Sequence, residues 1–214
     1  MGFVVAIDGP AGAGKGVIAA RLGAWLGLPV FDSGLLYRAV AAAVLAAGGD
    51  LDDEAACVKA ATALDPADLA GPALRSAAMG EAASRVAVHP KVREALIDIQ
   101  RTFAAREPGA IVDGRDIGTV ILKDAQAKIF VTASPESRAA RRWGQLRQQG
   151  EHALFADILA DIARRDARDE ARAAAPLKPA PDAVLLDTTD LSIDAAFDAA
   201  RRIVEAARAR SGQS

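Results

Sequence analysis

The residues best suited to chemistry lie in a glycine-rich turn near the N-terminus: Gly9, Pro10, Ala11, Gly12, Ala13, Gly14, Lys15 and Gly16. The turn follows the apolar residues 3–7 and precedes a helix-like run over residues 17–26. Glycines allow successive backbone N–H groups to curl around an anion, and a helix N-terminus adds partial positive charge. Lys15 supplies a mobile cation for the outer phosphates. The pattern therefore favours a cradle for a nucleoside triphosphate over a turn that only joins a strand to a helix.

The residue after Lys15 narrows the class of protein. The general phosphate-loop pattern has Ser or Thr there, whose hydroxyl binds Mg²⁺ directly, but this chain has Gly16. A magnesium ion must then be held by phosphates, by water and by carboxylates elsewhere. Asp113, at the end of the apolar residues 110–112, is a candidate for contact with metal-bound water. Taken alone, an Asp before a Gly is more typical of a turn.

Composition limits the possible functions. A chain of 214 residues predicts one compact domain with room for a mobile subdomain. With 26 basic and 28 acidic residues, the net charge of −2 argues against a dedicated nucleic-acid partner. Cys57 is the single cysteine, which fits a reducing compartment. No apolar run is long enough to span a bilayer and no signal peptide is visible. We therefore expect a cytoplasmic protein with no membrane partner.

Short apolar runs predict the fold. Those at residues 3–7, 29–31, 110–112, 128–132 and 183–186 alternate with helical segments. This alternation predicts a three-layer α/β/α fold with a five-stranded parallel sheet, in which ligands bind beyond the carboxyl ends of the strands. Two helical regions interrupt it: residues 34–106, with a Gly/Pro/Asp-rich break at 65–72, and residues 136–172, split at Gly150.

Arginines gather in the second helical region. One helix face would carry Arg165, Arg168, Asp169 and Arg172, and the preceding helix carries Arg138, Arg141 and Arg142. Alone, such a face is more typical of a solvated helix with ion pairs. Beside a phosphate cradle, the two helices predict a lid over residues 136–172 that closes over phosphates, because arginine binds phosphate bidentately. An arginine-rich site without an obvious catalytic base favours a phosphate acceptor, which is largely ionised at neutral pH, over a hydroxyl acceptor.

Together, these motifs resemble those of the bacterial cytidylate kinases, within the nucleoside monophosphate kinases. The matching segments, in family order, are 9–16, 32–38, 84–86, 90–96, 113–119, 165–172 and 175–177. The sequences Ser-Thr-Gly-Asp near position 33 and Asp-Gly-Phe-Pro-Arg near position 113, typical of adenylate kinases, are absent. The resemblance implies a phosphate-loop kinase fold with a helical acceptor-binding subdomain at about residues 34–106. It further implies transfer of the γ-phosphoryl group of ATP to CMP or dCMP, with Mg²⁺, by a monomer.

The resemblance also implies site residues. Lys15, the amides of the turn up to Val17, and the lid residues Arg138 and Arg142 would bind ATP. Which of Arg138, Arg141 and Arg142 meets the transferred phosphate stays open. CMP would be bound by Ser33, Tyr37, Arg38, Ser84, Arg93, Arg115, Asp116, Arg165, Asp169 and Arg172. Within that set, Arg38, Arg115 and Arg172 match residues that hold the acceptor phosphate, and Arg165 and Asp169 match residues that hold the sugar. The catalytic group would comprise Lys15, Arg115, Arg165 and Arg172.

Ser33, Ser84, Arg93 and Asp116 match residues around the base, and their chemistry suits cytosine. A carboxylate at Asp116 accepts from the exocyclic amine, and Arg93 donates to the ring nitrogen and carbonyl. Uracil would turn an oxygen towards Asp116 and leave two acceptors facing each other, which is strongly unfavourable in a buried site.

Two departures from the family pattern affect the affinity for ATP or the closure of the acceptor-binding subdomain. Val17 stands where the family usually has Thr or Ser, so one hydroxyl contact to phosphate is missing. Residues 66–73 replace a longer insert of many relatives, so we expect a smaller, helical acceptor subdomain.

The alternative functions are those of another small phosphate-loop kinase, acting on UMP or a hydroxyl, and of a nucleotide-dependent switch protein. Switch proteins usually keep Ser or Thr at the position of Gly16.

Overall fold

The computed structural model describes residues 2–148 and 150–212. Within them, a five-stranded sheet has the order β2-β3-β1-β4-β5, and every neighbouring pair is parallel. The strands are β1 (Phe3–Asp8), β2 (Val30–Asp32), β3 (Gly109–Gly114), β4 (Ala127–Thr132) and β5 (Val184–Asp187). The predicted α/β class with a five-stranded parallel sheet is therefore confirmed, with strand ends shifted by one or two residues.

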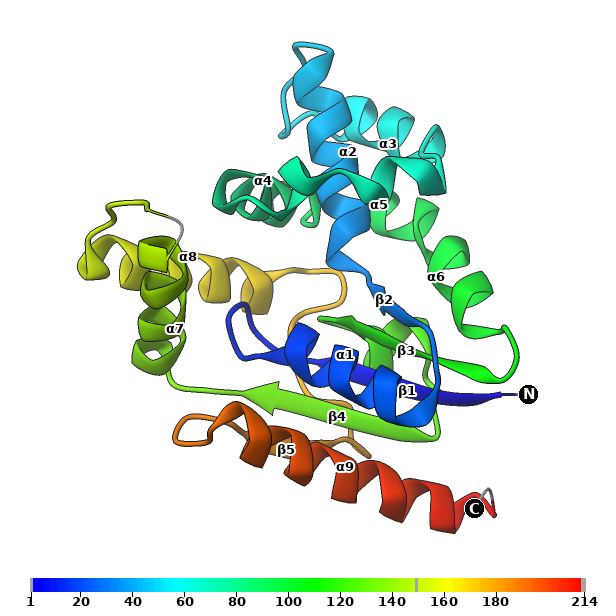
Figure 1. Ribbon diagram of the computed structural model, residues 1–214. Helices are drawn as coiled ribbons and strands as arrows, with labels where there is room; N and C mark the ends of the chain where they lie inside the picture. The colour runs from blue at the N-terminus through cyan, green and yellow to red at the C-terminus, as the bar shows by residue number, and fades with distance from the viewer. Residues whose placement is uncertain (1, 149, 213–214) are drawn as a thin grey trace.

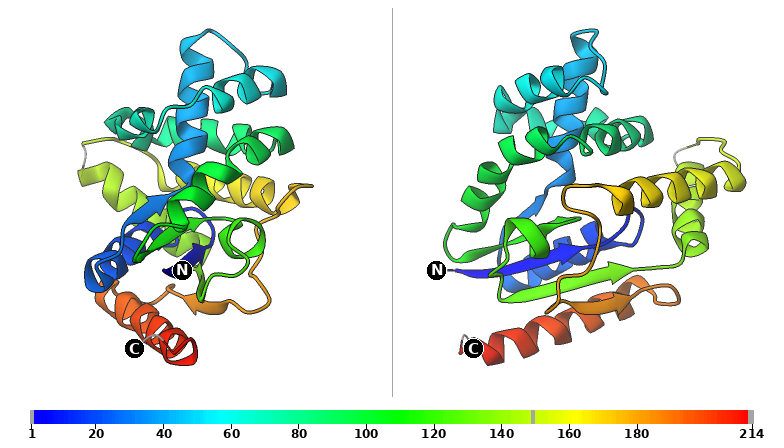
Figure 2. Two further views of the ribbon diagram at one scale, coloured as in Figure 1. Left: turned by 90° about the vertical axis from the view of Figure 1, so that its right-hand side faces the viewer. Right: turned by 180° about the vertical axis from the view of Figure 1, so that it is seen from behind.

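Alternation along the central strand β1 builds a core on each face of the sheet. Val5 and Ile7 pack with α1 (Lys15–Leu26) and α9 (Ile193–Arg210), whereas Val4 and Ala6 pack with residues of the opposite layer. That layer contains α6 (Ile97–Ala104) and a short π-helical turn, η3 (Ile117–Ile121). Helices therefore cover both faces of the sheet, and both chain termini lie at the end opposite α7 and α8 (Figures 1 and 2).

The connection from β2 to β3 forms a helical insert above the sheet in Figure 1. It has a core of its own, centred on Leu36, Val40, Val86, Val92 and Leu96. Residues 66–75 form two short 3₁₀ turns here, so the described part of this break contains no strand. The elements of the insert are α2 (Gly34–Ala46), α3 (Glu54–Thr62), η1 (Pro66–Ala70), η2 (Pro72–Arg75), α4 (Ala77–Val86), α5 (Pro90–Ala95) and α6.

The connection from β4 to β5 forms a helical pair, α7 (Pro135–Gln148) and α8 (Phe155–Ala171). A small cluster that includes Ala139, Leu146, Ile158 and Ile162 holds the two helices together. The hydroxyl of Ser134 accepts the Ser137 backbone N–H at 3.1 Å, as expected for the cap of α7. The predicted break falls at Gly150, beside residue 149, which lies outside the described residues. None of the described helices is long and apolar enough to cross a membrane.

Candidate active site

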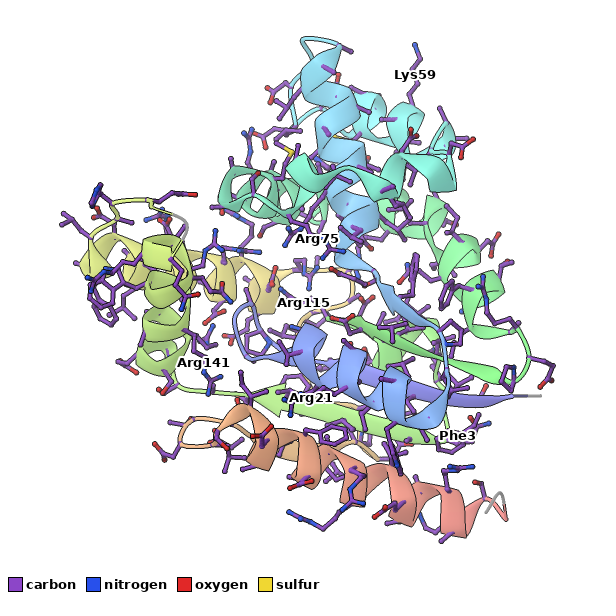
Figure 3. The ribbon with its side chains drawn as sticks, in the orientation of Figure 1. Phe3, Arg21, Lys59, Arg75, Arg115 and Arg141 are labelled. Atoms are coloured by element: carbon purple, nitrogen blue, oxygen red, sulfur yellow. The ribbon has the colours of Figure 1, made fainter. Side chains whose placement is uncertain are left out.

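A cavity of about 810 Å³ opens at the carboxyl ends of the strands, between the glycine-rich turn, the helical insert and the helical pair. Figure 3 shows Arg75 and Arg115 between the insert and the sheet, and Arg141 close to the base of α7. The predicted site residues that line this cavity are Ala11, Gly12, Ala13, Gly14, Lys15, Gly16, Val17, Ser33, Tyr37, Arg38, Ser84, Arg93, Asp113, Arg115, Asp116, Arg138, Arg142, Arg165, Asp169 and Arg172. Gly9 and Pro10 do not line it and form the start of the turn.

Backbone geometry explains the glycines of the turn. Gly12 and Gly14 have φ values of 78° and 92°, which favour glycine. At Gly9, a Cβ would lie 1.9 Å from the carbonyl oxygen of Val131, so only glycine lets the turn leave β1 this close to β4. At Gly16, a Cβ would meet no atom within 4 Å. Steric crowding therefore does not explain why position 16 carries glycine rather than Ser or Thr.

The Lys15 side chain curls back into the turn. Its Nζ donates to the Pro10 carbonyl oxygen at 2.8 Å, and the side chain is buried. Burial and the guanidinium of Arg115 lower the pKa of Lys15, while the carboxylates of Asp113 and Asp32 oppose this shift. The Lys15 side chain is therefore already desolvated and held against the turn by its contact with the Pro10 carbonyl oxygen.

Asp113 is the residue best placed to meet a metal ion. It is 5% exposed, and its Oδ1 atom has no hydrogen-bond partner. Burial and the neighbouring Asp32 raise the pKa of Asp113, whereas Lys15 lowers it. A buried carboxylate oxygen without a partner, beside a phosphate loop, fits contact with metal-bound water. The described residues contain no group of three His, Cys, Asp or Glu side chains that could hold a metal ion. Most ligands of a magnesium ion would therefore come from phosphates and water.

Guanidinium groups converge around one carboxylate, Asp169 on α8. Arg115 donates through Nε to Asp169 Oδ2 at 3.0 Å, and Arg172 donates through Nε to the Asp169 carbonyl oxygen at 3.2 Å. The Arg165 and Arg38 guanidiniums lie next to Gly80 on α4, where a Cβ would be 3.4 Å and 3.8 Å from their Nη atoms. We call Arg38, Arg115, Arg165 and Arg172 the arginine cluster.

Burial and mutual repulsion disfavour the charged form of three members of the arginine cluster, and nearby carboxylates offset this only in part. Burial, together with the nearby Arg115, lowers the pKa values of Arg38, Arg165 and Arg172. Burial disfavours the charged form of Asp169, but Arg115 and Arg172 outweigh this and lower its pKa. Arg165 Nε and Arg172 Nη2 are buried without hydrogen-bond partners. Several desolvated cations with free donors form a site for a multiply charged anion.

A second group of polar side chains lies deeper, under the insert. Arg93 and Asp116 form a buried ion pair between Nη2 and Oδ2, and Arg93 lies over the Tyr37 ring at 5.4 Å. Burial raises the pKa of Tyr37 to about 12. Ser33 is also buried here, between the ends of β2 and β3. The arrangement presents a fixed planar donor and a fixed acceptor within one wall of the cavity.

The arginines of α7 differ in their freedom to bind a ligand. Arg138 donates to both carboxylate oxygens of Asp166, at 3.0 Å and 2.5 Å, and to the carbonyl oxygens of Ala11 and Ala133. Arg141 donates to the hydroxyl and carbonyl oxygens of Thr188. By contrast, within the described part of the chain Arg142 makes a single hydrogen bond, a long one of 3.5 Å to the Gln145 side-chain oxygen. Arg138 thus ties α7 to α8 and to the turn, and Arg142 is the more open of the two predicted ATP ligands.

Three contributions were missed by reasoning from the sequence. Gly80 gives the arginine cluster room on α4. Arg168, on the predicted cationic face, donates to the Ser84 hydroxyl at 3.0 Å and so joins α8 to α4. Asp8 accepts two backbone N–H groups from the segment that follows Asp116. The one signal in the sequence for Asp8 was its position as a polar residue at the end of an apolar strand. Nothing in the sequence pattern distinguished Gly80 from the other glycines.

The parallel sheet, the lysine-bearing turn and the arginine cluster together define a phosphate-loop phosphotransferase. Among solved structures, a gluconokinase from Sinorhizobium meliloti 1021 covers 100% of this chain and 97% of its own, at 16% identity and a TM-score of 0.51, which shows the fold alone. The family model for cytidylate kinase matches residues 5–206. The chain belongs to the cytidylate kinase family, and its class of enzyme is the nucleoside monophosphate kinases.

Curated relatives are similar over nearly the whole chain. The cytidylate kinase of Caulobacter vibrioides (strain NA1000 / CB15N) is 62% identical over 210 residues, covering 98% of this chain and 99% of the relative. That of Xanthobacter autotrophicus is 61% identical over 207 residues, covering 97% and 99%. This family phosphorylates CMP and dCMP with ATP. The predicted resemblance is therefore confirmed.

Proposed function

We propose that this chain transfers the γ-phosphoryl group of ATP to CMP or dCMP, giving ADP and CDP or dCDP, within the cavity of about 810 Å³. The observation that carries the proposal is the position of the arginine cluster, between the glycine-rich turn and the polar pocket of Arg93 and Asp116. One cavity thus offers a triphosphate cradle, an anion site and a site for a polar base.

The turn is proposed to hold the donor. Its backbone N–H groups and the Lys15 ammonium bind the β- and γ-phosphates, displacing the Nζ contact to the Pro10 carbonyl oxygen. Arg142 reaches the transferred phosphoryl group from α7, whereas Arg138 supports the turn through the carbonyl oxygen of Ala11. Phosphoryl transfer needs positioning and charge stabilisation more than covalent chemistry, and these cations supply both.

The insert and α8 are proposed to hold the acceptor. Arg38, Arg115 and Arg172 bind the phosphate of CMP, and Arg165 stabilises the charge that develops as it attacks the γ-phosphorus. Asp169 has one oxygen engaged by Arg115, which leaves the other for a sugar hydroxyl. No carboxylate is needed as a base because the acceptor phosphate is already largely ionised at neutral pH. Residues 34–106 then act as the acceptor-binding subdomain and residues 136–172 as a lid.

The base pocket is proposed to read cytosine. The carboxylate of Asp116 accepts from the exocyclic amine, and Arg93 donates to the ring, with Ser33, Ser84 and Tyr37 closing the pocket. In the structure, the Ser84 hydroxyl is already held by Arg168. Because Arg93 and Asp116 are buried, a base that turned an oxygen towards the Asp116 carboxylate would bind poorly.

Magnesium is proposed as the cofactor, on the basis of the unpartnered Oδ1 of Asp113. Asp113 would hold a water of the ion, and the remaining ligands would be phosphates and water. When bound, the ion supplies charge neutralisation between the phosphates. We also propose a cytoplasmic monomer; the described lining of the cavity comes from this one chain and needs no second copy to form.

The test is ADP release from ATP and Mg²⁺ with CMP, dCMP, UMP, AMP and shikimate supplied separately. Turnover with CMP and dCMP, and little with the others, is the expected result. Equal turnover with UMP would still show a nucleoside monophosphate kinase, but it would refute the role of Asp116 in recognising the base. Slow ADP release that is independent of every acceptor would refute the proposal. Light scattering at assay concentration tests the monomer.

A further inference from the structure

The carboxylate of Asp8 caps a helical turn that belongs to a different part of the chain. Asp8 ends β1 and is 4% exposed. Its Oδ1 accepts the backbone N–H of Ile117 at 2.8 Å, and its Oδ2 accepts that of Gly118 at 2.7 Å. These are the first two residues of η3, and the residue preceding them, Asp116, provides no side-chain cap. Each oxygen therefore satisfies one free N–H at the start of the turn.

The segment that Asp8 holds carries the two acceptor-facing side chains Arg115 and Asp116. It joins the end of β3 to η3, and Asp8 itself is in register with Gly114 on the neighbouring strand. On its other side the segment meets Ser33, because a Cβ at Gly114 would lie 2.4 Å from the Ser33 hydroxyl oxygen. The segment is thus confined between Ser33 and Asp8, and its position depends on both.

Asp8 is not among the residues that line the cavity, but the next residue along the chain, Gly9, begins the phosphate-binding turn. The pKa of Asp8 is raised to about 6: burial and, to a smaller extent, Asp116 raise it, and the two backbone N–H groups and Lys15 oppose them in part. The chain therefore keeps a desolvated carboxylate at the junction between its donor turn and its acceptor segment.

We propose that Asp8 is a positioning residue for base selection: its two hydrogen bonds to η3 set where Asp116 and Arg115 stand relative to the donor turn. Asp8 touches neither nucleotide. Its effect reaches the reaction through the segment that it holds, so it governs the preference for CMP more than the affinity for ATP. This inference rests on the proposed function, because it presumes that Asp116 reads the base.

The decisive variant is Asp8→Asn, which keeps the size of the side chain. An amide oxygen accepts one N–H, but the amide NH₂ then faces the second N–H, so one of the two bonds is lost. We expect the KM for CMP to rise about tenfold and the ratio of kcat/KM for CMP over UMP to fall by a similar factor. The loss of a hydrogen bond to a charged group changes an equilibrium constant by about that factor. Equilibrium binding of ATP should change by less than about twofold, being governed by the turn itself.

Asp53→Asn is the matched control. Asp53 also accepts two backbone N–H groups, from Ala55 and Ala56 at the start of α3, but it does not line the cavity. Asn is itself a good N-cap, so this variant should keep wild-type kinetics. A folded Asp8→Asn protein with an unchanged CMP-over-UMP ratio overturns the inference, even if its melting temperature or both affinities fall.

A second variant covers the case in which Asp8→Asn does not fold by circular dichroism. At Gly118 a Cβ would lie 3.3 Å from Asp8 Oδ2 and 3.2 Å from the flexible Lys128 Cδ, so Gly118→Ala presses on the same hydrogen bond. We expect a fall of about threefold in the ratio, and an unchanged ratio overturns the inference. The wild-type enzyme is assayed alongside. If it does not phosphorylate CMP at all, the proposed function fails and not only the role of Asp8.

Discussion

The substitution Asp116→Asn tests base recognition most directly. In the structure the Asp116 carboxylate is buried, forms an ion pair with Arg93 and lies at the wall of the cavity. Replacement by Ala would leave the buried Arg93 charge unpaired, which costs about 3–5 kcal/mol and confuses recognition with folding. Asn keeps the size of the side chain and one oxygen that Arg93 can approach, while it removes the negative charge.

The magnitude follows from the hydrogen bond that is lost. A bond from the cytosine amine to a buried carboxylate contributes about 1.5–3 kcal/mol. At about 1.4 kcal/mol per tenfold change, kcat/KM for CMP should fall about 10- to 150-fold. The amide NH₂ of Asn can donate to the exocyclic oxygen of uracil, so kcat/KM for UMP should stay level or rise. The CMP-over-UMP ratio should therefore fall by at least about tenfold.

Initial rates of ADP formation, measured at saturating ATP over a range of CMP and UMP concentrations, give both values of kcat/KM. A melting curve for each protein shows whether the variant is folded. If Asp116→Asn is folded and keeps the wild-type ratio, then Asp116 does not contact the base and the reasoning is refuted. A fall in both values by the same factor would also refute it, because that result assigns Asp116 a general role in positioning the acceptor.

Three further outcomes are expected. Val17 is 47% exposed at the turn, and Val17→Thr should tighten ATP about tenfold in a calorimetric titration by restoring a hydroxyl contact to phosphate. Arg168→Ala should raise the KM for CMP by several-fold through loss of the hydrogen bond to Ser84, whereas Arg164→Ala on the same helix should not. Because the pKa of Asp8 is raised to about 6, its stabilising contribution is present below about pH 4 and lost as the pH rises through 6. In urea unfolding, the free energy of unfolding of the wild type should therefore fall relative to that of Asp8→Asn as the pH rises from about 4 to above 6, by up to about 3 kcal/mol.

Local patterns in the sequence were sufficient to predict the sheet and much of the cavity. Short apolar runs that end in polar residues predict buried parallel strands, and the residues after their carboxyl ends must share one edge of the sheet. Lys15 after β1, Ser33 after β2 and Asp113 at the end of β3 therefore line one cavity, as predicted. These predictions depended on neighbours along the chain and on one general rule of topology.

Partnerships between distant side chains could not be predicted in this way. Arg138 pairs with Asp166 across 28 residues, and Arg115 pairs with Asp169 across 54. Each pairing depends on how α7 packs on α8, or on how the segment after β3 meets α8, and several arginines of similar spacing could have taken the same place. Asp8 bonds to residues 109 and 110 positions away, so its role appears only once β1 and β3 are adjacent.

The arginine cluster has a consequence for the protein outside the reaction. Three of its members have pKa values that are lowered mainly by burial and further by neighbouring arginines, so the folded chain without ligand holds desolvated cations close together. Any small dianion that enters the cavity relieves their repulsion and stabilises the folded state by mass action. Inorganic phosphate or sulfate in a buffer should thus have two effects: it should raise the melting temperature, and it should compete with CMP for the arginine cluster. In a cell, the same linkage would make the lifetime of the protein depend on the size of its nucleotide pool.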